Sequence, residues 1–280
     1  MPGTAKVSQV TQRTQLTPVS VTVAGNGAGL VLAHGAGGSV EANYGPILDA
    51  LTAGHTVVGI DYPGTGASPR SETPLDEDWL ADQLVAAAVA EGLETFAVSG
   101  FSLGGPIAVR AAARHPERVT ALILTATFAH ADTRLALSAR LWRDLHAAGD
   151  IYRLAQFLTL VGFSTQALAA IPEAQLGQAL KDFAAAIPAG TPEHTELVER
   201  IDVRADLAGI TVPTLVIVTA NDALVDPSLQ RELAAAIPTA KTVDIPTGHL
   251  PMAERPEHWQ QLITDFLGSI EPIEPATKEN

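Results

Sequence analysis

Short apolar, β-branched runs recur along the chain, and segments with helical spacing separate them. The runs predict strands over residues 19–23, 30–33, 57–60, 96–98, 121–125, 215–218 and 242–245. The intervening segments predict helices over residues 40–53, 76–91, 103–114, 227–236 and 256–267. Alternation of this kind is typical of βαβ units, so the pattern predicts an α/β fold with a mostly parallel sheet and helices on both faces.

One long segment interrupts this alternation, because no clear strand occurs between residues 125 and 214. Its apolar residues repeat at helical spacing instead, first Leu137, Leu141 and Leu145, and then Ile151, Leu154, Leu158 and Val161. We therefore expect a core formed by residues 1–128 and 206–280, with a mostly helical cap over residues 129–205. The cap is expected at the carboxyl edge of the sheet, where α/β folds place ligand sites. The alternative is a peripheral helical pair remote from any site.

Composition narrows the class of protein. The chain has 280 residues, of which 46% are hydrophobic and 17% charged, as expected for one globular core that carries a lid. A net charge of -14, from 31 acidic and 17 basic residues, repels phosphate backbones and anionic lipids, so neither nucleic acid nor membrane is an expected partner. The chain has no cysteine, which excludes disulfides, thiolate catalysis and cysteine metal sites.

The segment at the N-terminus is polar over residues 8–15, which argues against a signal peptide, and no stretch approaches the length of a membrane span. The sequence therefore predicts a cytoplasmic protein. No cluster of metal-ligating residues stands out, and we expect neither a metal nor an organic cofactor. The expected partner is a small-molecule substrate, and the expected assembly is a monomer or homodimer.

A candidate nucleophile lies between a predicted strand and a predicted helix. The pattern Gly100-x-Ser102-x-Gly104 follows the apolar run that begins at Phe96. The glycines permit a tight turn that lifts the serine hydroxyl above the sheet and aims the helix amides at it. The pattern alone is weak, but its place between strand and helix makes Ser102 a strong candidate.

A serine hydroxyl needs a base within hydrogen-bonding reach, and that base needs an orienting acid. His249 and Asp222 each follow a predicted strand, which places both at carboxyl strand ends beside Ser102. Asp226 competes for the acidic role, but it precedes Pro227 and is better explained as a helix cap. We therefore predict Ser102, His249 and Asp222 as the catalytic residues.

These motifs occur in the order found in α/β hydrolases, which the sequence resembles over residues 20–268 apart from the cap. The resemblance is carried by His34-Gly35, Asp61-Tyr62-Pro63-Gly64-x-Gly66-x-Ser68, Gly100-x-Ser102-x-Gly104-Gly105, Asp222 and Gly248-His249. The resemblance implies a sheet of the eight-stranded type, an oxyanion hole formed by the amides of Ala36 and Leu103, and structural roles for His34 and for the Asp61 turn. One departure is Thr219, at a position three residues before the acid where many relatives have glycine.

A serine nucleophile indicates acyl chemistry, and our first hypothesis is hydrolysis of an ester or lactone of a small, largely apolar molecule through an acyl-enzyme. Dehalogenase and epoxide hydrolase chemistry is set aside because both need a carboxylate nucleophile. The candidate substrate-binding residues are the aromatic side chains Phe101, Phe128, Trp142, Tyr152 and Phe157, although aromatic residues on helices more often belong to the core.

Three other functions stay open on the same framework. The first is C–C bond hydrolysis, for which Asn43 lies where some such enzymes place a polar group. The second is a lyase, cyclase or acyl-transfer step in a biosynthetic pathway. The third is a binding protein without catalysis, which the complete set of motifs disfavours.

Overall fold

A single seven-stranded sheet organises the computed structural model, which describes residues 19–270. Its strands are β1 (Ser20–Ala24), β2 (Ala28–Ala33), β3 (His55–Asp61), β4 (Phe96–Phe101), β5 (Val119–Thr125), β6 (Thr214–Thr219) and β7 (Ala240–Ile245). Their order across the sheet is β1-β3-β2-β4-β5-β6-β7, and only β1 runs antiparallel to its neighbour. The predicted α/β class is confirmed, with one strand fewer in the described residues than the eight-stranded type. The polar N-terminal residues 8–15 lie outside the described residues.

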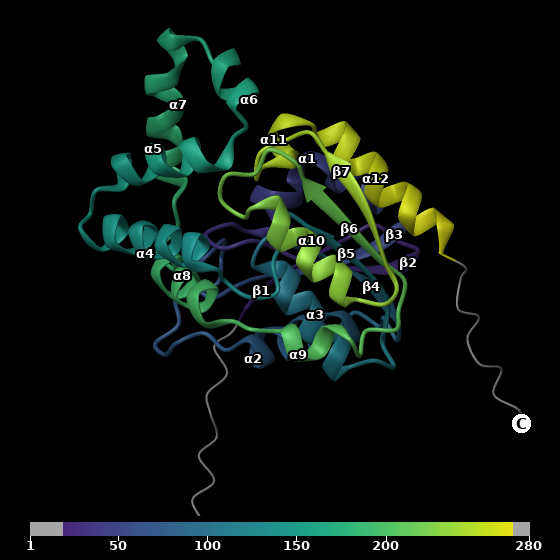
Figure 1. Cartoon of the computed structure of the whole chain (residues 1–280). Helices are drawn as coiled ribbons and strands as arrows, with labels where there is room; N and C mark the ends of the chain where they lie inside the picture. The colour runs from purple at the N-terminus through teal and green to yellow at the C-terminus, as the bar shows by residue number, and fades with distance from the viewer. Residues whose placement is uncertain (1–18, 271–280) are drawn as a thin grey trace, which may run out of the picture.

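Helices cover both faces of the sheet, as the apolar runs predict (Figure 1). One face packs against α1 (Val40–Thr52), α11 (Pro251–Glu254) and α12 (Pro256–Ser269). The other packs against α2 (Glu77–Ala90), α3 (Gly104–Arg114), α9 (Arg204–Leu207) and α10 (Pro227–Ala236). All six residues of β4 are buried, as expected of a central parallel strand with apolar side chains on both faces.

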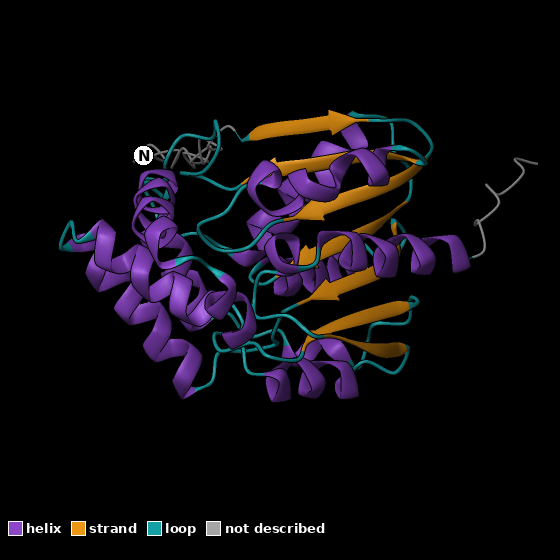
Figure 2. Cartoon of the chain, turned by 90° about the horizontal axis from the view of Figure 1, so that it is seen from above, coloured by secondary structure: helices purple, strands orange, loops and turns teal. Residues whose placement is uncertain are grey.

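Five further helices lie between β5 and β6, in the segment over residues 129–205, which we call the insert. They are α4 (Thr133–Ala147), α5 (Ile151–Gly162), α6 (Thr165–Ala170), α7 (Glu173–Ala186) and α8 (Thr191–Arg200). Figure 2 shows these helices beyond the arrowheads of the parallel strands, at one end of the sheet. Leu154 and Leu158 are buried on α5, whereas Leu137 and Leu141 on α4 are 58% and 45% exposed. Helical spacing thus predicted the helices of the insert but not which face each one buries.

None of the helices within residues 19–270 combines the length and apolar character needed to cross a membrane.

Candidate active site

The turn between β4 and α3 holds Ser102 in a strained conformation. Ser102 has φ +53°, a left-handed value that is uncommon for a residue other than glycine. Its amide donates to the carbonyl of Thr125 over 3.0 Å, which ties the turn to the neighbouring strand. A Cβ atom on Gly104 would lie 2.0 Å from the carbonyl oxygen of Ala33, so only glycine permits this close approach. The strain is typical of a turn that presents a reactive hydroxyl.

Ser102, His249 and Asp222 meet at the carboxyl ends of β4, β7 and β6. The Nε2 atom of His249 lies 3.0 Å from the Oγ atom of Ser102, and its Nδ1 atom lies 2.8 Å from Oδ2 of Asp222. The residues are only 7%, 5% and 5% exposed, respectively. When Nδ1 donates to the carboxylate, Nε2 is left free to accept the serine proton. The arrangement is suited to activating the Ser102 hydroxyl.

The carboxylate of Asp222 is held on both of its oxygens. Its Oδ1 atom accepts hydrogen bonds from the backbone amides of Leu224 and Val225, each over 2.9 Å. Its Oδ2 atom accepts from the hydroxyl of Thr219 over 2.8 Å, in addition to the bond from His249. Several donors on one carboxylate fix its orientation toward His249.

Two residues behind Asp222 were not predicted as part of the site. Gln230, which is fully buried on α10, donates to the hydroxyl of Thr219 over 2.8 Å and accepts from the Thr219 amide over 3.0 Å. The Thr219 hydroxyl lies 2.8 Å from Oδ2 of Asp222 and 3.2 Å from Oε1 of Gln230, so Asp222 is the nearer of its two acceptors. The position at which the sequence departs from many relatives thus supplies an extra donor to the acid, and that departure was the only signal in the sequence.

Asp226 has the role that its sequence context predicts. It caps α10, and its side chain accepts from the amide of Ser228 over 2.9 Å. That hydrogen bond lowers the pKa of the Asp226 carboxyl. The prediction that Asp226 is a helix cap is confirmed.

The loop after β2 presents one backbone amide that has no acceptor among the described residues. Within residues 35–38, the amide of Gly35 donates to Oδ1 of Asn43 over 2.9 Å, and that of Gly38 donates to the carbonyl of Gly35 over 3.2 Å. Gly37 donates to Nδ1 of His194 over 3.2 Å. In the described part of the chain, the Ala36 amide has no such acceptor.

The amide of Leu103, next to Ser102, is likewise without an acceptor among residues 19–270. Ala36 and Leu103 are the two positions that the resemblance implies for an oxyanion hole. Two unpaired amides beside a nucleophile are suited to bind the negative oxygen of a tetrahedral intermediate. The side-chain oxygen of Asn43 accepts from Gly35 and so holds this loop. Asn43 therefore has a structural role here, whereas C–C bond hydrolysis would need its side chain at the substrate.

Two buried histidines brace the same loop in their neutral form. His34 lies against the ring of Tyr62, with ring centroids 3.9 Å apart, and its Nε2 atom accepts from the Tyr62 amide over 2.8 Å. His194, from α8, lies between Gly37 and the carbonyl of Pro63, to which its Nε2 atom is 3.0 Å away. Burial lowers the pKa of His34 to about 3 and that of His194 to about 4. The structural role predicted for His34 is confirmed, and the role of His194 was missed.

Comparison with known proteins identifies the family. The sequence model of the α/β hydrolase fold matches residues 30–256. The chain belongs to this family. A hydrolase of this family uses the loops at the carboxyl ends of the strands, where Ser102, Asp222 and His249 lie here.

Similar proteins include enzymes that act on different bonds. The hydrolase is 35% identical to the pyrrolizixenacetamide deacetylase of Xenorhabdus hominickii, over 89% of this chain and 94% of that one. It is 31% identical to a pimeloyl-[acyl-carrier protein] methyl ester esterase of Neisseria meningitidis, over 85% and 93% of the two chains. The enol-lactonase of Burkholderia xenovorans LB400 superposes with a TM-score of 0.77, at 25% identity, covering 89% of this chain and 96% of that one. The chain is therefore an enzyme with hydrolase activity.

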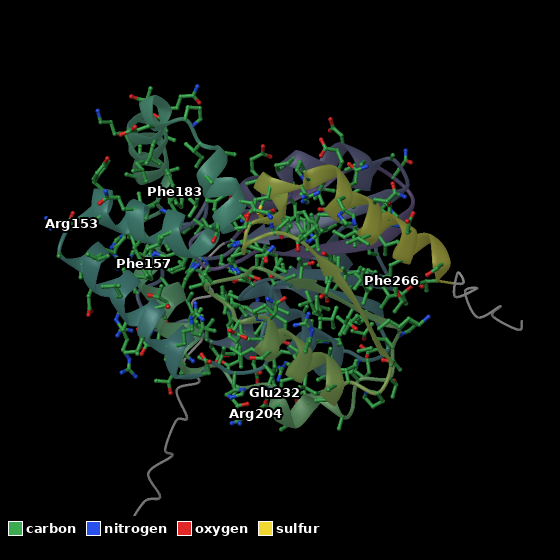
Figure 3. All side chains as sticks on the ribbon, turned by 45° about the horizontal axis from the view of Figure 1, so that its top comes forward. Arg153, Phe157, Phe183, Arg204, Glu232 and Phe266 are labelled. Carbon is green, nitrogen blue, oxygen red and sulfur yellow. The ribbon has the colours of Figure 1, made fainter. Side chains whose placement is uncertain are left out.

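The predicted substrate-binding residues of the hydrolase lie in different surroundings. Phe101 is buried with its ring centroid 5.2 Å from that of His249, and Phe128 is buried in the core. Trp142 covers Gly37 from α4. Phe157 is half-buried among the helices of the insert (Figure 3), and Tyr152 is 41% exposed on α5. Phe101 and Trp142 are thus the two that lie against the loops of the candidate site, at His249 and at Gly37 respectively.

Within residues 19–270, no group of three or more histidine, aspartate and glutamate side chains is arranged to hold a metal ion.

Proposed function

We propose that the protein is a serine hydrolase that cleaves an ester or lactone of a small, largely apolar molecule through an acyl-enzyme. Ser102 is the nucleophile, His249 the general base and then acid, and Asp222 the orienting acid. The observation that carries the proposal is the continuous chain of hydrogen-bonding distances, 3.0 Å from Ser102 to His249 and 2.8 Å from His249 to Asp222. Hydroxyl, imidazole and carboxylate in this order form the arrangement that activates a serine.

In the proposed reaction, His249 transfers protons between Ser102, the leaving group and water. The Oγ atom of Ser102 attacks the carbonyl carbon while its proton passes to Nε2 of His249. The imidazolium then protonates the leaving oxygen, so that the ester bond breaks and the acyl group stays on Ser102. Water, deprotonated by His249, releases the acid and restores the serine hydroxyl.

The negative oxygen of each tetrahedral intermediate is bound by the amides of Ala36 and Leu103. Neither amide donates elsewhere in the described part of the chain, so both are available without rearrangement. Each such donor contributes about 3 kcal/mol to the stabilisation of the transition state.

The insert acts in this proposal as a cap that excludes water from the acyl-enzyme. Supporting contacts come from Trp142 and His194, two residues of the insert that lie on Gly37 beside the oxyanion loop. Phe101 and Trp142 form the walls for the acyl group nearest the reacting serine. The small-molecule substrate, the cytoplasmic location and the monomer or homodimer stay predictions from the sequence.

A second candidate is the deacylation of an amide. It is favoured by the 35% identity to a protein named as a deacetylase. The same three residues would catalyse this reaction. An amine leaves only after it is protonated, so the transfer of the proton from His249 to the leaving nitrogen becomes the harder step.

The test is hydrolysis of chromogenic esters, lactones and N-acetylated amines of increasing acyl length by the wild type and by Ser102→Ala. We expect turnover to depend on acyl size and to fall at least about 10³-fold in Ser102→Ala. Faster turnover of amides than of esters would favour the second candidate. Turnover that survives in a folded Ser102→Ala would refute the covalent mechanism, and a folded wild type inactive on the whole panel would favour lyase, cyclase, acyl-transfer or C–C bond chemistry.

A further inference from the structure

Glu254, the last residue of α11, joins two parts of the molecule that lie far apart in the sequence. Its Oε1 atom accepts from the amide of Gly248 over 3.0 Å and from the amide of Ser164 over 2.8 Å. Its Oε2 atom accepts from the hydroxyl of Ser164 over 2.6 Å. Gly248 directly precedes His249, whereas Ser164 belongs to the insert. One carboxylate therefore binds the backbone next to the catalytic base and the backbone of the insert at once.

The contact continues into the helix that follows. The hydroxyl of Ser164 also accepts from the amide of Ala167 over 3.1 Å, which makes Ser164 the N-cap of α6. Hydrogen bonds therefore run from the start of α6 through Ser164 and Glu254 to Gly248. Two side chains, those of Ser164 and Glu254, thus connect the first turn of α6 with the residue beside His249.

The backbones at this contact are already as close as they can be. A Cβ atom on Gly248 would lie 2.4 Å from the amide nitrogen of Ser164 and 2.6 Å from the carbonyl oxygen of Gly162, so no larger residue fits without moving the insert. The packing leaves little freedom in how the insert sits on the turn that carries His249.

On its other side the contact borders a cavity of about 920 Å³ between α6, α7, α11 and α12, with Ser164 and Glu254 in its wall. The Glu254 carboxylate is half-buried there rather than enclosed in the core. A shorter side chain would be replaced by solvent, so its removal takes away the hydrogen bonds without leaving a closed void.

We infer that Glu254 is a positioning residue for the reaction. It holds the Gly248 turn so that Nε2 of His249 stays within reach of Ser102, and it makes this alignment depend on the seating of the insert through Ser164. This inference rests on the proposed function, in which His249 is the base. Small errors in the place of a catalytic base cost much in rate, because proton transfer requires close approach and correct orientation.

The test compares Glu254→Ala, Glu254→Gln and Ser164→Ala with the wild type. Two experiments are made on each variant. The first measures kcat and KM on an ester that the wild type hydrolyses, and the second measures the rate at which an alkyl fluorophosphonate labels Ser102. We expect Glu254→Ala to lower kcat and the labelling rate by about 10- to 100-fold, as for other residues that orient a catalytic group, with KM changed less than about twofold.

The conservative variant separates positioning from charge. In Glu254→Gln one oxygen can still accept from both backbone amides, and the new amide group can donate to the Ser164 hydroxyl. We therefore expect its kcat to stay within about threefold of wild type. Ser164→Ala keeps the backbone bond but loses the hydroxyl, so we expect a loss intermediate between those of the two Glu254 variants.

Asp82→Asn is the matched control. The carboxylate of Asp82 on α2 also has three hydrogen-bonding partners, two side-chain nitrogens of Arg114 and one of His115. Arg114 ends α3, ten residues and about 15 Å of helix beyond Gly104. We expect Asp82→Asn to lower the midpoint of thermal unfolding and to leave kcat unchanged.

The inference is overturned if Glu254→Ala keeps wild-type kcat and labelling rate, or if only KM rises. If Glu254→Ala does not fold, Glu254→Met, which keeps the length without an acceptor, takes its place under the same two criteria. Ser102→Ala is assayed beside the set. Turnover that survives there refutes the proposed mechanism itself, whereas a silent Ser102→Ala with an unaffected Glu254 variant refutes only the positioning role.

Discussion

The core and the insert contribute to the active site by different physical means. In the core, backbone geometry sets the arrangement, because Ser102 lies in a left-handed turn and Asp222 is fixed by the amides of Leu224 and Val225. The insert reaches the site through side chains, since His194 binds the amide of Gly37 and Ser164 binds Glu254. Parallel strands bring their carboxyl ends together whatever lies above them, whereas a helical insert has to be fastened.

The two fastening points lie at opposite ends of the proposed machinery. His194 acts on the loop that carries the Ala36 amide, and Ser164 acts through Glu254 on the turn that carries His249. One contact uses a buried neutral imidazole, and the other uses a half-buried carboxylate. This difference predicts two separate effects. Acid conditions should lower the free energy of unfolding by protonating His194, whereas mutation of Glu254 should lower the rate of turnover.

The largest effect is expected in the core, at the orienting acid. We expect Asp222→Asn to lower kcat by about 10⁴-fold, because an amide donor favours the wrong tautomer of His249. Steady-state kinetics on an ester substrate measure it. Asp226→Asn is the matched control and should stay near wild type, because Asp226 caps α10. If the two variants exchanged these results, the acid would be Asp226.

A smaller effect is expected from the buried histidines when the pH falls. The pKa of His34 is lowered from 6.5 to about 3 and that of His194 to about 4, so the unfolded chain takes up protons that the folded one refuses. Their contribution to stability is complete above pH 6.5 and is lost progressively as the pH falls toward these values. At pH 5 each histidine should cost about 2 kcal/mol of the free energy of unfolding relative to pH 7.

Urea unfolding at pH 7 and pH 5 measures this loss. His194→Gln removes one titrating group, so the loss between the two pH values should shrink by about 2 kcal/mol, whatever the variant does to stability at pH 7. His258→Gln replaces a solvent-exposed histidine on α12 and is the control. An unchanged loss in His194→Gln would show that the pKa of His194 is not lowered in the folded protein.

The smallest effect compares two helix caps of the same chemistry, one in each region. Asp226 caps α10 in the core, and Asp132 caps α4 in the insert by accepting from the amide of Leu135 over 2.7 Å. We expect Asp226→Ala and Asp132→Ala each to cost about 1 kcal/mol in urea unfolding and to leave turnover within about twofold. A loss in only the core variant, with faster proteolysis of the insert in the other, would mean that the insert opens by itself.

The sequence by itself determined most of the core and the candidate catalytic residues. Strands and helices of an α/β sheet have their own patterns of apolar residues, and Ser102, Asp222 and His249 each lie within four residues of the end of a strand. Position after a strand is local information, and the parallel topology converts it into proximity. Asp226 could be interpreted as a cap for the same reason, because a cap is defined within three residues of its helix.

Only the tertiary structure decided the contacts that fasten the site. His194 and Gly37 are 157 residues apart, and Ser164 and Glu254 are 90 apart, so no spacing rule links them. Thr219 stood out only as a departure from the family pattern, and Gln230 gave no signal at all. Leu137 and Leu141 also show what spacing cannot predict. Their spacing correctly predicted a helix, but both side chains are exposed on it. Local patterns encode which element forms, but which side chains meet depends on how the whole chain packs.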